Sequence, residues 1–206
     1  MKLLAIECAT ECCSVALFEQ DMLLGGAARV LGRGHAEALI PMIAALPGKG
    51  QADRIAVSLG PGSFTGLRVG LAAARALALA WRAELIGYST HGLVAAMARA
   101  ELGGGEIGVA MTGGHGEWFV SLFDQAGLAV APPHSRSPEE AAALLGAHNI
   151  AGSQAEALVG LRGSGHALAL LPDARQIGLL TDTALTGDVR LDYGRAPDAR
   201  LPGHLL

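Results

Sequence analysis

Basic residues are scarce in this 206-residue sequence. Its 15 Lys and Arg residues are outnumbered by 19 Asp and Glu residues, the formal net charge is −4, and the only lysines are Lys2 and Lys49. A surface that binds nucleic acid is expected to be clearly basic. The composition therefore argues against direct binding of an RNA backbone, with a local arginine patch as the remaining alternative.

Cysteine is also rare, and its spacing argues against two kinds of scaffold. Cys8, Cys12 and Cys13 lie close together near the N-terminus. They form no Cys-x-x-Cys pair, no second cluster completes a zinc site, and an odd, clustered set does not suit a disulfide framework. We expect these cysteines to be small core residues in a reducing cytosol.

Long uninterrupted apolar runs are absent. The N-terminus has one Lys and then a short apolar run that Glu7 interrupts, which is not the pattern of a signal peptide. No uncharged stretch reaches the roughly 18 apolar residues that a membrane span needs. Because 51% of the residues are hydrophobic, the chain is also unlike disordered proteins. We expect a folded, cytoplasmic protein that does not span a membrane.

Apolar runs and turn signals predict an α/β fold in the first half. The order of the predicted elements fits a domain with a mixed sheet flanked by helices. Strands are predicted at residues 2–7, 12–18, 22–30, 54–59 and 84–88, and helices at residues 35–46, 67–81 and 89–102. The triple glycine at 103–105 is the predicted boundary, and it divides the chain into an N-terminal lobe, 1–103, and a smaller C-terminal lobe with a tail, 104–206.

The second half is predicted to be less regular. Ser137, Pro138 and Glu140 have the spacing of a capping box with proline in the first helical turn, so a helix is expected to begin there. Strands are predicted at residues 106–111, 118–123 and 148–152, and a helix at residues 173–185.

The predicted helices 35–46 and 67–81 are apolar on more sides than one buried face requires. Either they cover each other and the sheet within the chain, or their outer faces form a helix–helix interface with another subunit. For the second alternative, the interface residues that we predict are Leu39, Met42, Ile43, Leu67, Leu71, Ala74 and Ala78, with Arg68 and Arg75 at its polar edge.

A glycine-rich loop precedes the second of these helices. It reads Gly60, Pro61, Gly62, Ser63, Phe64, Thr65 and Gly66. The loop stands between a predicted strand and a helix, where backbone N–H groups can bind an anion, but it lacks the Gly-Lys-Ser/Thr ending of a P-loop. We expect the glycines to permit a tight turn under closely packed helices. Ser63 and Thr65 are expected to cap the helix, because no base accompanies them as nucleophiles.

No histidine has the spacing of a zinc site. His35 is followed four residues later by Leu39 and not by a second histidine, so we expect it at a helix start or an interface. His115 and Glu117 either form a general acid–base pair or belong to an exposed loop. The sequence predicts no metal, no cofactor and no catalytic residue in this chain.

Several segments carry a family resemblance. Residues 4–17 resemble the first hairpin of the actin-like ATPase fold found in sugar kinases and heat-shock proteins. Residues 35–43, 60–68 and 193–200 are similar to segments of the TsaB (YeaZ) family. The resemblance implies an α/β, actin-like (ribonuclease H-like) fold with two small lobes, in which mixed sheets are flanked by helices.

The same resemblance implies a function. Proteins of this family are non-catalytic subunits that bind their paralogue TsaD and, with the ATPase TsaE, support threonylcarbamoyl transfer to the tRNA adenosine next to the anticodon. The implied partner contact is a helical bundle that includes the two apolar helices. The implied states are a heterodimer with TsaD and a homodimer when the protein is alone, with tRNA contacted only indirectly.

Two departures from the family pattern bear on this reading. Glu7 stands where the family usually has Asp, a residue that helps to hold metal and phosphates in actin-like ATPases. Residues 112–117 replace a sequence that is commonly Asp-Ala-Arg-like. A stand-alone actin-like ATPase or small-molecule kinase is the alternative function, and a glycoprotease-like metallopeptidase is a weaker one.

Overall fold

The first lobe is built on a six-stranded mixed sheet. The computed structural model describes residues 1–194, and in it the strand order of this sheet is β11-β5-β4-β1-β2-β3. Strands β1, β2 and β3 form an antiparallel meander, whereas β4 and β5 run parallel to β1. The strands are β1 (Lys2–Glu7), β2 (Cys12–Glu19), β3 (Met22–Val30), β4 (Arg54–Ser58), β5 (Glu84–Tyr88) and β11 (Leu185–Thr186).

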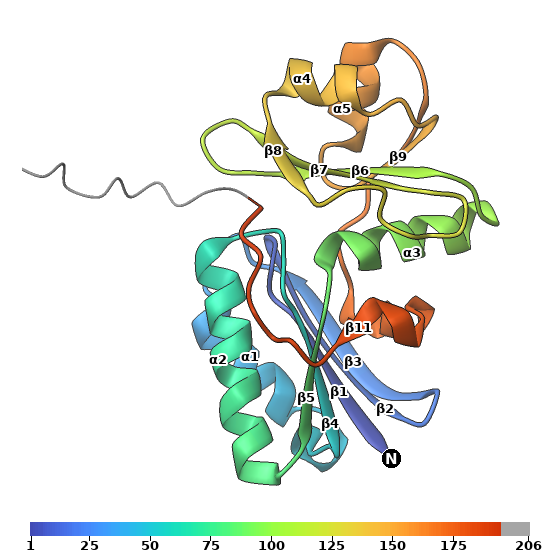
Figure 1. The fold of residues 1–206 in the computed structure, drawn as a ribbon. Coiled ribbons are helices and arrows are strands. Elements are labelled where there is room, and N and C mark those ends of the chain that lie inside the picture. The colour runs from blue at the N-terminus through green and yellow to red at the C-terminus, as the bar shows by residue number, and fades with distance from the viewer. Residues whose placement is uncertain (195–206) are drawn as a thin grey trace, which may run out of the picture.

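The two faces of this sheet differ because successive side chains of a strand point to opposite faces. On β1, Leu4 and Ile6 belong to one buried cluster, whereas Ala5 belongs to the other. The large side chains pack against α1 (His35–Ala44), the 3-10 turn η1 (Pro47–Gly50) and α2 (Phe64–Trp81). The two helices lie side by side on this face (Figure 1).

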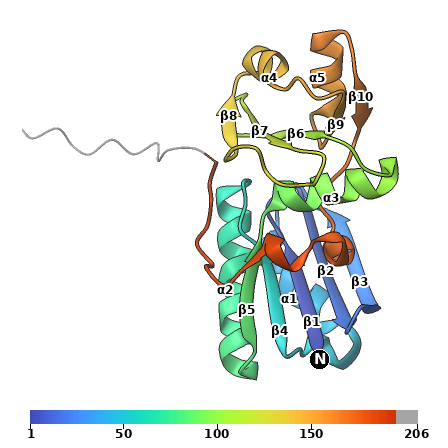
Figure 2. The ribbon, with the colours of Figure 1, turned by 45° about the vertical axis from the view of Figure 1, so that its right-hand side comes forward.

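The second lobe has a five-stranded mixed sheet in the order β10-β9-β6-β7-β8. Helix α3 (Thr90–Leu102) packs on its inner face, between the two sheets, and α4 (Pro138–Leu144) and α5 (Ala155–Arg162) pack on its outer face (Figure 2). The strands are β6 (Ile107–Thr112), β7 (Trp118–Phe123), β8 (His134–Arg136), β9 (Asn149–Ala151) and β10 (His166–Leu168).

Helix starts follow the local capping signals. The Ser137 hydroxyl accepts a hydrogen bond from the Glu140 amide, and the Glu140 carboxylate accepts one from the Ser137 amide, so the predicted capping box is confirmed. Ser89 caps α3 as expected. Helix α2 begins at Phe64, three residues before the predicted start, because the Ser63 hydroxyl accepts from the Gly66 amide.

The predicted helix at 173–185 is wrong. The segment forms two short 3-10 helices, η2 (Ala174–Leu179) and η3 (Asp182–Ala184), which are separated by extended backbone at Leu180 and Thr181. The elements β8, α5, β10 and β11 were not predicted. These are short elements, and β11 in addition pairs with β5, a strand that is distant in the sequence.

The predicted C-terminal lobe, 104–206, also needs correction. Ala174 and Ile177 of η2 are buried against the Ala5 face of the first sheet, and the Ala174 amide donates to the Ser14 hydroxyl at 2.9 Å. Strand β11 then pairs with β5. Residues 174–194 therefore return to the first lobe, where η2 and Leu93 of α3 together cover the second face of the sheet.

Candidate functional site

The glycine-rich loop fastens the start of α2 to the hairpin of β1 and β2. The Ser63 amide donates to the carbonyl oxygen of Ala9 at 2.6 Å. A Cβ atom at Gly62 would collide with that same carbonyl oxygen, and one at Gly66 would collide with the carbonyl oxygen of Cys8. The glycines thus allow two backbones to touch, and Ser63 is a helix cap, as predicted. Thr65 is exposed within α2.

The apolar residues predicted at the partner interface lie in the core instead. The leucines, alanines, methionine and isoleucine of that set are at most 9% exposed, on the sheet-facing sides of α1 and α2; they are Leu39, Met42, Ile43, Leu67, Leu71, Ala74 and Ala78. The error is one of rotation, because Arg68 and Arg75 border the buried side of α2 and the exposed apolar residues lie on the other side of the helix. A helix that is apolar nearly all round gives no sequence signal for its orientation.

A different apolar surface remains uncovered on these helices. We define the outer face of α1–α2 as Ile40 and Ala44 of α1 together with Ala72, Ala76 and Leu79 of α2, all of which are exposed. Leu79 is 84% exposed and Ile40 is 50% exposed. Contiguous exposed apolar surface is typical of interaction sites, so this face is a candidate for one. The extra apolar surface that the sequence indicated is therefore present on α1 and α2, but on the side of the helices opposite the one predicted.

Helix α2 also has the length and composition of a membrane span, the only such helix among the described residues. Its inner face packs against the first sheet, and Arg68 and Arg75 interrupt its surface. A sheet-packed helix of a folded domain meets the same criteria.

The two arginines predicted at the interface edge hold the C-terminal segment, which we define as residues 187–194. The Arg68 guanidinium lies 3.6 Å from the centre of the Phe64 ring, and its Nε donates to the Tyr193 hydroxyl at 3.1 Å. The Arg75 guanidinium donates to the carbonyl oxygen of Val189 at 3.4 Å. The segment therefore runs along α2 (Figure 1). The rest of the tail similarity, residues 195–200, lies outside the described residues.

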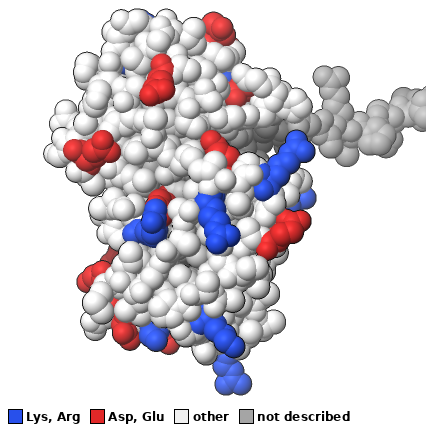
Figure 3. All heavy atoms as spheres, turned by 180° about the vertical axis from the view of Figure 1, so that it is seen from behind, with Lys and Arg blue, Asp and Glu red and all other residues white. Residues whose placement is uncertain are grey.

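Charged side chains do not gather into one basic surface on the face shown in Figure 3. Arginine and lysine residues are interspersed there with aspartate and glutamate residues, between wide areas without charge. This distribution agrees with the acidic net charge of the chain.

Glu7 lies in the interior of the first lobe. Its carboxylate is fully buried, Oε1 accepts from the Ala9 amide at 2.7 Å, and Oε2 has no hydrogen-bond partner among the described residues. Burial raises the pKa of Glu7 from its ordinary 4.5 to about 7. The side chain that replaces the family's usual Asp is thus not presented to a ligand in solution.

The remaining candidate residues are the three cysteines, His35 and Glu117. Cys8, Cys12 and Cys13 are buried free thiols, as expected of core residues, and the sulfur atoms of Cys8 and Cys13 are 3.6 Å apart. His35 is the first residue of α1 and is buried. Glu117 accepts a hydrogen bond from Ser135 at 2.5 Å. Within residues 1–194, no group of three or more His, Cys, Asp or Glu residues has a metal-binding arrangement.

The chain is similar to known proteins in sequence and in structure. The family model described as TsaD, tRNA N6-adenosine threonylcarbamoyltransferase, matches residues 26–175. Over 95 residues the chain is 39% identical to the tRNA threonylcarbamoyladenosine biosynthesis protein TsaB of Escherichia coli (strain K12). That match covers 44% of this chain and 41% of the relative, so the chain matches less than half of the curated relative's length.

Solved structures support the same relationship over most of the chain. YeaZ from Pseudomonas aeruginosa aligns with a TM-score of 0.73 and 27% identity, covering 85% of this chain and 88% of that chain. The ethanolamine utilization protein EutJ from Carboxydothermus hydrogenoformans aligns with a TM-score of 0.53 and 13% identity, over 87% and 89% of the two chains, which shows a shared fold only. The predicted actin-like α/β fold with two mixed sheets is therefore confirmed.

Proposed function

The chain belongs to the TsaD, tRNA N6-adenosine threonylcarbamoyltransferase, family, and from that premise we propose that it is a TsaB-type, non-catalytic subunit of tRNA threonylcarbamoyladenosine biosynthesis. In this proposal the chain binds a TsaD paralogue in the cytoplasm and supports threonylcarbamoyl transfer by that partner to the tRNA adenosine beside the anticodon. A TsaE-type ATPase joins the larger complex, and tRNA is contacted only indirectly.

The observation that carries the proposal is the outer face of α1–α2. Its small residues Ala44, Ala72 and Ala76 would let a partner helix approach closely, and Leu79 and Ile40 offer apolar side chains for burial. Burying a leucine that is exposed in the free chain contributes about 1.5–3 kcal/mol. Glu37, Arg68 and Arg75 lie on the exposed sides of the same helices and would form a polar rim, the arrangement common to protein interfaces.

The first test is light scattering after gel filtration, on the chain alone and mixed with TsaD from the same organism. We expect a homodimer that converts to a heterodimer, because both assemblies would use the same outer face. A chain that stays monomeric and does not bind TsaD would contradict the proposal.

Substitution on the outer face makes the test specific. We expect Leu79→Glu to weaken TsaD binding by about tenfold or more, since it places a charge in the centre of an apolar contact. Leu161→Glu on α5 is the matched control, because Leu161 is a helical leucine that is 55% exposed. Equal losses for the two variants would indicate a nonspecific effect of charge and would reject this surface.

The non-catalytic role is tested separately. The chain alone is expected to show no ATP hydrolysis above background, and threonylcarbamoyl transfer by TsaD is expected to depend on its presence. Hydrolysis of ATP by the isolated chain that Leu79→Glu leaves unchanged would instead favour the stand-alone ATPase.

A further inference from the structure

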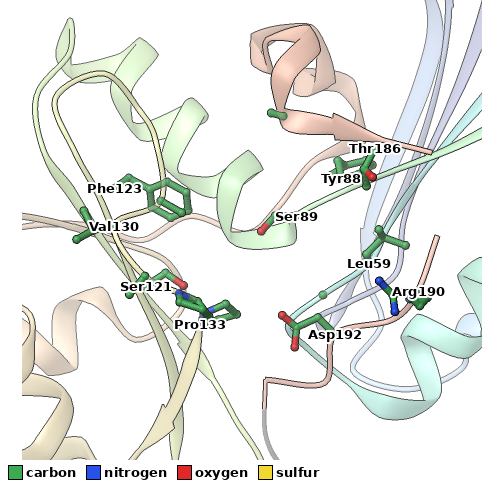
Figure 4. A pocket seen from close by; sticks show the side chains of 15 residues that line it. Leu59, Tyr88, Ser89, Ser121, Phe123, Val130, Pro133, Thr186, Arg190 and Asp192 are labelled. Atoms are coloured by element: carbon green, nitrogen blue, oxygen red, sulfur yellow. The ribbon is translucent and has the colours of Figure 1, made fainter. Parts of the chain in front are cut away.

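A cavity of about 510 Å³ lies between the two lobes, and no residue of α1 or α2 lines it. Its walls are mostly apolar. Leu59 and Tyr88 of the first lobe lie across from Phe123, Val130 and Pro133 of the second (Figure 4). A volume of about 300–1,000 Å³ with apolar walls and a few placed polar groups is typical of small-molecule sites.

One polar group in the cavity wall is buried and is hydrogen-bonded to a buried histidine. Ser121 of β7 is 6% exposed, and its hydroxyl oxygen lies 2.7 Å from Nδ1 of His91 in the first turn of α3. Burial lowers the pKa of His91 to about 3. The imidazole is therefore neutral at neutral pH, and only one of its two nitrogens carries a hydrogen.

This pair of side chains has one more donor hydrogen than its own hydrogen bond can use. Nε2 of His91 is buried and has no partner among the described residues. If Nε2 carried the hydrogen, the buried N–H would lack an acceptor, and orphaned buried N–H groups are rarer than unfilled acceptors. The favoured tautomer donates from Nδ1 to Ser121. The Ser121 hydroxyl hydrogen is then left for an acceptor inside the cavity.

The opposite rim offers acceptors and a negative balance of charge. Asp192 lines the cavity on the side away from Ser121 (Figure 4), and its Oδ1 accepts from the Gly194 amide at 2.8 Å. Arg190 also lines the rim, but its guanidinium is paired with Asp188 at 2.5 Å. Asp188 does not line the cavity, but it already pairs with Arg190, so the Asp192 carboxylate is the charge of the lining that has no ion-pair partner among the described residues. That charge disfavours an anionic ligand.

We propose that this cavity binds a neutral small molecule that carries an amide on an apolar body. The amide carbonyl accepts a hydrogen bond from Ser121, the amide N–H donates to Asp192, and the apolar body lies against Phe123 and Val130. Val130 is 58% exposed in the free chain, so a ligand in this position covers apolar surface that the fold leaves open. The inference does not depend on partner binding.

The test uses 3-phenylpropanamide as the probe and the full-length, ¹⁵N-labelled chain. Titration is expected to shift the backbone amide signals of Ser89, Ser121 and Thr186, which line the cavity. The carboxylate analogue, 3-phenylpropanoate, has the same body and is expected to bind at least about threefold more weakly because of the negative rim. Equal affinity of the two probes, or shifts that gather around Leu79 instead, would overturn the proposal.

Variants distinguish a loss of binding at the cavity from a general loss of folding. Ser121→Ala is expected to weaken amide binding about five- to tenfold, the effect of one lost hydrogen bond. Ser153→Ala is the control, because Ser153 belongs to the second lobe, bonds to Thr112 and does not line the cavity. Val130→Trp in the exposed loop fills the cavity from outside the core and should abolish binding with an unchanged circular dichroism spectrum. Unchanged affinity in either cavity variant would contradict the proposal.

Discussion

The two sides of α2 have nearly the same composition and opposite surroundings. On the inner side Leu67, Leu71 and Ala74 are at most 6% exposed, against the first sheet. On the outer side Ala72 and Ala76 are exposed and Leu79 is 84% exposed. Composition alone therefore does not distinguish a core face from a docking face. The difference arises because one side meets a sheet of matching shape and the other meets nothing within residues 1–194.

The largest effect is expected from a charge placed on the inner side of α2. Leu71→Glu removes a buried leucine and leaves a carboxylate in the core, so we expect a loss of about 4 kcal/mol or more in the free energy of unfolding. Leu79→Glu should change that free energy by less than about 0.5 kcal/mol, as surface substitutions do. Urea unfolding followed by circular dichroism measures both. A stable Leu71→Glu variant would mean that the assigned inner side is wrong.

A buried charged group is also present beneath the inner side of α2, because this side packs above β1, the strand that carries Glu7. The folded-state pKa of Glu7, about 7, exceeds the ordinary 4.5, so the folded chain holds a proton between pH 4.5 and 7 that the unfolded chain has lost. Stability should therefore fall by about 3 kcal/mol as the pH rises through this window, and then level off. Glu7→Gln should remove that fall and make the variant more stable than the parent at pH 8.

Unfolding in urea at pH 5 and pH 8 measures this effect. His91 changes the stability in the opposite direction with pH. Its pKa is lowered to about 3 in the folded chain, so the folded chain loses stability as the pH falls below 6.5, where the unfolded histidine gains a proton. That contribution is the same in parent and variant, so their difference isolates Glu7. Glu19→Gln on the exposed end of β2 should follow the parent profile. A parallel profile for Glu7→Gln would show that the carboxylate is solvated after all.

The smallest expected effect lies at the outer edge of α2. Arg68→Ala removes the stacking of the guanidinium on Phe64 and its hydrogen bond to Tyr193, an exposed contact of about 0.5–1 kcal/mol. Hydrogen exchange in residues 187–194 should become faster, while global stability changes little. Arg68→Lys keeps the charge but loses the planar stacking, so it should show an intermediate rate. Unchanged exchange in both variants would show that Arg68 does not hold the segment.

Local signals explain most of what could be predicted. Strands β1, β3 and β5 have their predicted bounds, and β2 and β4 differ from theirs by one residue, because apolar runs and nearby turns define such strands. Ser63, Ser89 and Ser137 act as caps through hydrogen bonds that span only three residues. The return of residues 174–194 to the first sheet had no such signal, since its partners Ser14 and Tyr88 are distant in sequence.

The candidate surface shows the same division. The sequence by itself determined that α1 and α2 carry more apolar surface than one face can bury, and that glycines at 60, 62 and 66 permit a close turn. Only the tertiary structure decided which side of each helix faces the sheet, and that Arg68 and Arg75 bind the C-terminal segment. The interlobe cavity was also decided there, because Ser121 and Asp192 lie far apart in the chain. A local pattern specifies the element, whereas its rotation and long-range partners depend on how the whole core packs.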